Sequence, residues 1–330
     1  MKIQQTINSE WPTLYNPFVR DLAWIFYTPA LFTGSPFEFQ RDMAPDWLVQ
    51  LDRNPQPLMD YLNQQKSKLL GAYFEALWGF YLTHYPGKKL IARNLQVFDT
   101  STSARRTVGE FDFIYYDQSS AQYRHLEVAL KYYLGVPLKN ADAKEQIASS
   151  LDAKPAYSPL AHWIGPGKSD RLDKKVSKMT QQQCRLADSI HAKPTLERLQ
   201  IDSLVPEICL QGYLFYPNEA TISPPYEINP LHCRGKWLTL SQLEAGSWRG
   251  DYWQILSKPF WLSSPLRQRN QLDTFERLLF SIDRQFNEVL FPQLIASFVA
   301  LKGENGDQYV ADELYFIVPE EWSGSARSIA

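Results

Sequence analysis

The chain has 330 residues, 44% hydrophobic and 21% charged, so it is long enough to bury a large core in one or two domains. Its 34 basic and 36 acidic side chains nearly cancel, which excludes a strong overall attraction to nucleic acid or membranes and requires any such binding to be local. The 3 cysteines are too few and too widely spaced for a disulfide framework, and we expect a cytoplasmic location. No apolar run approaches the roughly 18 residues that span a bilayer, so we expect no membrane segment.

The N-terminal part of the chain is interrupted by prolines. Prolines recur through residues 1–60 and permit only short helices, such as one over 19–27, which predicts a packed N-terminal extension. A proline-free run then ends at Pro86, and its apolar residues recur at helical spacing from Leu69. This pattern predicts a longer helix that ends near His84.

The middle of the chain alternates strand and helix patterns. Runs 90–98, 109–116 and 123–134 are separated by short polar connections and predict a meander of three strands. A helix is expected over 169–191, and a strand over 207–216.

The last third of the sequence is rich in Trp and Pro. We expect mostly loops there, with one helix over 271–290. The chain is thus expected to consist of an N-terminal extension (1–60), a core (61–217) and an aromatic-rich C-terminal extension packed on the core (218–330).

Two neighbouring strand patterns carry carboxylates on their polar faces. Alternation over 109–116 places Asp112, with Glu110, opposite an aromatic face, and the next strand presents Glu127 and Lys131 together, with His125 in a supporting position. If the strands are hairpin neighbours, Asp112 and Glu127 can meet, because cross-strand partners lie within about 5.5 Å. Two hard oxygen ligands could then hold a divalent cation with a lysine beside it.

The helix before the strands offers a third carboxylate. Glu75 is the one acidic residue between Asp60 and Asp99, and it lies beside Gly71 and Gly79, which would let the helix approach a sheet closely. A buried lone carboxylate is costly unless it is paired or bound to metal.

This order of residues resembles the PD-(D/E)xK nuclease superfamily over residues 69–216. The resemblance implies an α/β fold with a restriction-endonuclease-like αβββαβ core and a central mixed sheet. It implies that Asp112 and Glu127 bind Mg²⁺ or Mn²⁺, that Glu75 supports the metal or its water, and that Lys131 positions the nucleophile or stabilises developing charge. The phrases at 19–24, 127–131 and 163–166 also resemble an uncharacterised bacterial family that is described only as a domain of unknown function.

The sequence departs from the superfamily pattern at the lysine. Glu127 and Lys131 are four residues apart instead of two, and Ala129 occupies the usual acidic position. In an extended strand this places Lys131 about 6.7 Å further along, on the correct face. Either the site tolerates a shifted carboxylate or it has lost its chemistry.

A basic segment follows the strands and is expected to contact a nucleic-acid backbone, although such a segment is often only a solvated helix face. Nearby, residues 181–183 are glutamines and resemble the helix glutamine that some of these nucleases use. Residues 162–169 end like a phosphate-binding P-loop but lack its first glycine, so an ATPase is rejected. The basic segment that is expected to contact nucleic acid consists of Lys168, Arg171, Lys174, Lys175 and Lys178.

The sequence therefore favours a Mg²⁺-dependent nuclease that hydrolyses phosphodiester bonds, with DNA favoured over RNA. The alternative is a catalytically degenerate nuclease-fold module that binds nucleic acid or a protein partner, and a third interpretation is a structural scaffold. Simpler interpretations of single residues also stay open: Asp112 paired with a nearby arginine, Glu127 paired with Lys131 on an exposed strand, and Glu75 paired with Arg93.

Overall fold

The computed structural model describes residues 13–37, 39, 44–99, 101, 106–137, 159–259, 261–301 and 308–329. Its contacts divide the chain into two compact units. We call them the N-terminal unit, which holds Trp11–Leu130 and Lys175–Gln211, and the C-terminal unit, which holds Lys131–Lys174 and Gly212–Ala330. Each unit is assembled from separate stretches, whereas the expected three-part division follows chain order.

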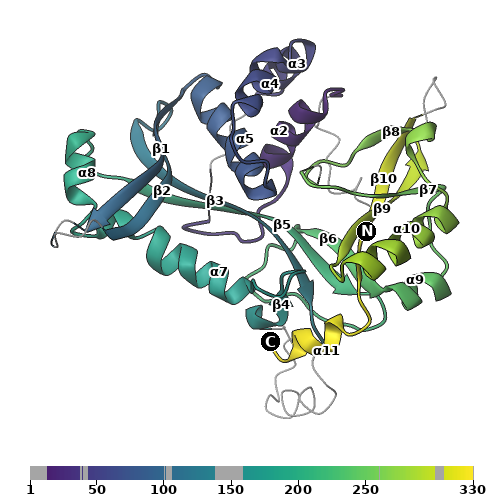
Figure 1. The fold of residues 1–330 in the computed structure, drawn as a ribbon. Coiled ribbons are helices and arrows are strands. Elements are labelled where there is room, and N and C mark those ends of the chain that lie inside the picture. Colours follow the sequence, from purple (N-terminus) through teal and green to yellow (C-terminus); the bar gives the residue numbers. More distant parts are fainter. Residues whose placement is uncertain are drawn as a thin grey trace. The chain divides into compact units, whose positions relative to one another are not determined.

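Four helices form the first layer of the N-terminal unit. Figure 1 shows them grouped on one side of the strands of this unit. Three of them start at the prolines that interrupt this part of the sequence, since proline at the first turn is preorganised for a helix and has no N–H to satisfy. The helices are α2 (Pro17–Tyr27), α3 (Pro45–Arg53), α4 (Gln56–Asn63) and α5 (Leu70–His84).

The predicted helix before the strands is confirmed as α5, which packs on β1 (Lys88–Asp99). Most of its side chains are buried, which its nearly continuous apolar sequence requires. A Cβ at Gly79 would lie 2.6 Å from the Tyr61 hydroxyl and 3.4 Å from Arg93 Nη1. The glycine therefore permits the close approach of α5 to a β1 side chain.

The predicted meander is also confirmed. Strand β1 pairs antiparallel with β2 (Arg106–Asp117), and β2 pairs antiparallel with β3 (Gln122–Gly135). Strand β5 (Val205–Pro217) lies next to β3, which gives the order β1-β2-β3-β5.

The single helix expected over 169–191 is wrong. The segment forms a short helix α7 (Leu172–Lys178), a π-helical turn η2 (Met179–Gln183) and a 3₁₀ turn η3 (Leu186–Asp188), followed by α8 (Lys193–Arg198). Apolar periodicity assumes 3.6 residues per turn throughout and does not reveal a π turn. Within the N-terminal unit, residues of η3 and α8 join β1 and β2 in one apolar cluster.

The C-terminal unit has a mixed sheet, which confirms the predicted mixed α/β class. Its strand order is β5-β6-β10-β9-β7, in which β6 is parallel to both β5 and β10 and the other pairs are antiparallel. Strand β8 pairs with β10, and β4 pairs with β3. These strands are β4 (Trp163–Ile164), β6 (Cys233–Thr239), β7 (Tyr252–Ile255), β8 (Leu266–Gln268), β9 (Gln293–Ala300) and β10 (Gln308–Val318).

The expectation of mostly loops after residue 217 is therefore wrong. Buried aromatic residues such as Trp253, which is 2% exposed, lie on strands and fill a core with residues of the helices. The helix predicted over 271–290 is confirmed as α10 (Phe275–Glu288), which lies beside α9 (Leu240–Ala245), as Figure 1 shows. The last helix is α11 (Trp322–Arg327). In the described part of the chain, no helix combines the length and apolar character needed to cross a membrane.

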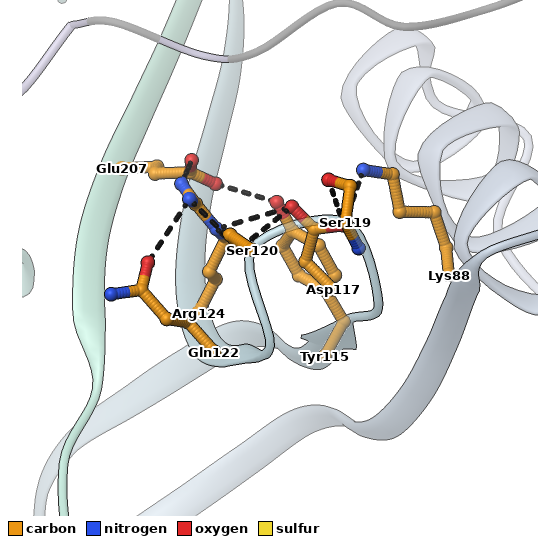
Figure 2. Close-up of polar contacts among 8 residues, drawn as sticks. All are labelled: Lys88, Tyr115, Asp117, Ser119, Ser120, Gln122, Arg124 and Glu207. Atoms are coloured by element: carbon orange, nitrogen blue, oxygen red, sulfur yellow. Dashed lines mark hydrogen bonds and ion pairs between the residues drawn. The ribbon is translucent and has the colours of Figure 1, made fainter.

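A buried ion network lies where β2 turns into β3 in the N-terminal unit (Figure 2). The Arg124 guanidinium binds Glu207, and its Nε lies 3.5 Å from Asp117 Oδ2. The Tyr115 hydroxyl donates to Glu207 over 2.7 Å, and Lys88 Nζ donates to Asp117 over 3.0 Å. Because these charges are paired and hydrogen-bonded, the network can lie inside the fold.

Candidate functional site

Asp112 and Glu127 meet between β2 and β3, as alternation predicts. The backbone register pairs Phe113 with Leu126, and at the next position the two side chains bridge the strands. Asp112 Oδ2 accepts from the Val128 N–H over 3.1 Å, and Glu127 Oε1 accepts from the Asp112 N–H over 3.4 Å. The carboxylates thus hold the strands together and face each other.

Glu127 is buried and held by two more side chains. His125 Nε2 lies 2.6 Å from Glu127 Oε1, and the Gln183 amide donates to Oε2. Both His125 and Glu127 are fully buried. Gln183 comes from η2, so the glutamine run noted in the sequence does supply a contact to this carboxylate.

Burial changes the protonation of the pair. Burial raises the pKa of Asp112 to about 7, and the charge of Glu127 raises it further than the Val128 hydrogen bond lowers it. Burial likewise raises the pKa of Glu127 to about 7, against the hydrogen bonds from Asp112. Burial lowers the pKa of His125 to about 4, so its ring is neutral at pH 7 and donates its Nε2–H to Glu127. Among the described residues, its Nδ1 has no hydrogen-bond partner.

Glu75 lies within electrostatic range of this pair. Burial and the charge of Asp112 raise the pKa of Glu75, whereas Arg93 and Lys175 lower it. Arg93 donates to the Gln65 side chain over 3.0 Å and stacks near Phe113. The interpretation of Glu75 as only a partner of Arg93 therefore misses its coupling to Asp112.

The lysine assignment from the sequence does not agree with the contacts. Lys131 belongs to the C-terminal unit, where its ammonium donates to Asp170. The interpretation of Glu127 and Lys131 as an exposed pair is also wrong, because Glu127 is buried and bonded to His125. The cation whose charge lowers the pKa of Glu127 is Lys175.

The basic residues predicted to contact nucleic acid fall into two groups, those already bound to other side chains and those exposed to solvent. Lys168 donates to Ser325 over 3.0 Å, and Arg171 pairs with Asp173 over 2.7 Å. Lys174 and Lys178 are exposed on α7, whereas Lys175 is half-buried. The helix begins at Leu172, so Lys168 and Arg171 precede it.

The resemblance of residues 162–169 to a P-loop is not supported. The Gly165 N–H donates to the Asp170 carbonyl over 2.9 Å, and the Lys168 N–H donates to the Gly165 carbonyl over 2.8 Å. Backbone donors that would cradle a phosphate are used within the turn. The rejection of an ATPase therefore has a structural reason.

The donor set suits Mg²⁺ through two carboxylates. In the described part of the chain, no group of three or more His, Cys, Asp or Glu side chains is arranged to hold a metal ion, so Glu75 does not join Asp112 and Glu127 as a third ligand. Mg²⁺, however, is usually held by one or two carboxylates together with waters and substrate phosphates. The desolvated pair of oxygen ligands fits that requirement.

The raised pKa values of the pair predict how stability depends on pH. Because the folded pKa values of Asp112 and Glu127, about 7, exceed their unfolded values, the folded state binds more protons above pH 4.5. In EDTA, stability contributed by the pair should therefore fall as the pH rises from about 4.5 to about 7. Thermal unfolding of wild type and Asp112→Asn at pH 5, 6, 7 and 8 checks this, and the variant should lose less stability across the series. Parallel profiles would contradict it.

Comparison with known proteins gives a family without an assigned activity. A family model described as a domain of unknown function (DUF1853) matches residues 20–318. No curated protein and no solved structure matches the chain.

Proposed function

We propose a function for this chain, which belongs to the DUF1853 family: Mg²⁺-dependent hydrolysis of phosphodiester bonds in nucleic acid, with DNA favoured over RNA. The observation that carries the proposal is the buried pair of Asp112 and Glu127. Their raised pKa values indicate that the two ionised carboxylates lack compensating positive charge, which a bound cation would supply. The chain order α5, β1, β2, β3, α7, β5, with the short strand β4 before α7 and the short helix α8 after it, supports a restriction-endonuclease-like core around this pair. That core is part of the proposal.

The residues take distinct roles in the proposed reaction. Asp112 and Glu127 would hold Mg²⁺, which when bound would activate water and neutralise charge on the phosphate. His125 and Gln183 orient Glu127 through its two oxygens. Glu75 would orient a water molecule on the Asp112 side of the pair.

Phosphate contacts would come from the exposed part of the basic segment. Lys174 and Lys178 are exposed on α7 and can neutralise backbone phosphates, which makes binding dependent on salt. Lys168 and Arg171 already bind groups of the C-terminal unit, so we assign them a smaller part. Such contacts position a nucleic acid and do not select a sequence.

One observation favours a second function, a degenerate module that binds nucleic acid without cleaving it. The lysine at the strand position nearest the superfamily pattern, Lys131, is bound to Asp170, and Ala129 replaces the usual acidic residue. A protein of this kind would keep salt-dependent binding and lack cleavage under all metal conditions.

A titration of Mn²⁺ into the full chain tests the proposal without a choice of substrate. We expect wild type to bind Mn²⁺, and Asp112→Asn to weaken binding by more than about 100-fold, since loss of a mere outer partner costs about 10- to 100-fold. Asp283→Asn makes the same change at an exposed position of α10 and should bind like wild type.

The same proteins are then compared in single-turnover cleavage of labelled single-stranded DNA, duplex DNA and RNA. Cleavage by wild type and Asp283→Asn but not by Asp112→Asn is the expected result. If wild type binds no Mn²⁺ and cleaves none of the three, the nuclease proposal fails. Oligonucleotide binding would then favour the degenerate module.

A further inference from the structure

We propose that Lys175, on α7, supplies the positive charge at the Asp112–Glu127 pair that the superfamily resemblance assigns to Lys131. This inference rests on the proposed function for its chemistry. The place of Lys175 beside the carboxylates can be tested apart from that function.

The π-helical turn accounts for the alignment of Lys175 with Gln183 around the helix axis. In a regular α-helix, at 3.6 residues per turn, Lys175 and Gln183 would point about 80° apart around the axis. The intervening turn η2 is wider, as the bond from the Cys184 N–H to the Met179 carbonyl at 2.9 Å shows, so each residue rotates less. The direction in which Gln183 points around the helix axis is therefore closer to that of Lys175 than it would be in a regular α-helix.

Gln183 fixes this helix face against the site. Its amide donates to Glu127 Oε2, which holds the face against β3 within the N-terminal unit. The rotation described above puts Lys175 on the same face, two turns earlier, and its side chain is half-buried. A π turn at this point is a local irregularity of the kind that often marks a functional position.

The electrostatics of the carboxylates agree with this geometry. The charge of Lys175 acts on each of Glu75, Asp112 and Glu127, and it lowers the pKa of all of them. Lys175 therefore acts on all three carboxylates and not on a single one.

Lys131, to which the superfamily resemblance assigns this role, forms an ion pair with another residue. The Lys131 ammonium binds Asp170, and burial together with the charge of Asp170 raises the pKa of the neighbouring Tyr133. Both groups of this ion pair are about one-third exposed, at 31% and 34%. Lys131 thus has a local role in the C-terminal unit.

In the proposed reaction, Lys175 would face the phosphate together with the carboxylate pair. A preorganised ammonium there would stabilise the negative charge that develops on the phosphoryl oxygens. The same positive charge repels a divalent cation, so its removal should have opposite effects on metal binding and on chemistry.

Lys175→Met separates these effects. At pH 8.5, above the pKa values of about 7 of both carboxyl groups, we expect Mn²⁺ to bind at least about threefold more tightly, because a nearby positive charge is lost. Single-turnover cleavage should become at least about 100-fold slower. A purely structural role would not tighten metal binding. Lys193→Met, at an exposed position of α8, is the control and should match wild type.

Two further comparisons make the inference independent of cleavage. Lys131→Met tests the assignment of this role to Lys131. If only that variant binds Mn²⁺ more tightly and cleaves more slowly, the assignment to Lys175 is wrong. A double-mutant cycle of Lys175→Met and Asp112→Asn, read from melting temperatures in EDTA, should be non-additive, since the lysine compensates that carboxylate. If the cycle shows coupling but wild type binds no Mn²⁺, the position of Lys175 beside the carboxylates is supported and the nuclease proposal is refuted. Additive melting temperatures would overturn the position itself.

Discussion

Gly212→Ala should prevent folding or lower the free energy of unfolding by more than about 4 kcal/mol. Gly212 has a φ of +137°, a backbone conformation that side-chain-bearing residues rarely adopt. A Cβ there would lie 1.7 Å from the Lys131 carbonyl oxygen and 2.7 Å from its carbon. Both are backbone atoms of a neighbouring strand, so no side-chain movement can relieve the clash.

Soluble yield and thermal unfolding by circular dichroism measure this effect. Gly71→Ala is a matched control, because Gly71 is exposed near the start of α5 and nothing lies within 4 Å of the added methyl. That variant should be as stable as wild type or more stable by up to about 1 kcal/mol. If Gly212→Ala melts at the wild-type temperature, the close contact of β3 and β5 at this point is refuted.

Arg124→Met should lower the free energy of unfolding by about 3 to 5 kcal/mol, the usual cost of breaking a buried ion pair. Its side chain is 13% exposed and binds Glu207, whose side chain is 2% exposed. Burial raises the pKa of Glu207, and the Tyr115 and Arg124 interactions oppose that effect. The variant leaves this carboxylate buried with less compensation.

Urea unfolding of single and double variants measures the network. Adding Glu207→Gln to Arg124→Met should recover part of the loss, because the uncompensated charge is removed. Arg284→Met is the control, since Arg284 pairs with Glu288 over 3.3 Å on the exposed face of α10 and should cost under about 0.5 kcal/mol. Equal losses in the two arginine variants would show that burial of the network contributes nothing.

The network also bears on the candidate site through the strand that carries it. Arg124 directly precedes His125, and His125 holds Glu127 through a 2.6 Å hydrogen bond. The charge of Glu207 also acts on His125. Fixing the start of β3 therefore helps to fix the orientation of Glu127, which the proposed metal site would require.

Much of the N-terminal unit could be predicted from local patterns. The apolar run before the strands predicts α5, and the alternating runs predict β1, β2 and β3 with their antiparallel meander. The same alternation, with the short connection after β2, predicts that Asp112 and Glu127 meet. These features depend on periods of 3.6 and 2 residues, which are visible in a single sequence.

Other features depend on contacts between segments that are distant in the chain. The pairs β6–β10, β7–β9 and β8–β10 join strands that are distant in the chain. The buried aromatic residues of this sheet resemble loop residues when only nearby Pro and Gly are considered. The π turn at Met179–Gln183 leaves apolar periodicity almost unchanged, and its position is fixed by the bond from Gln183 to Glu127.

The sequence by itself determined the helix, the meander and the pair of facing carboxylates, because each follows from the regular repeat of one or two adjacent segments. Only the tertiary structure bears on which lysine accompanies the pair, because Lys131 is bound by Asp170, whereas the charge of Lys175 lowers the pKa of Glu127. A side chain's electrostatic partner depends on distance in space, and spacing along a strand determines that distance only within the strand.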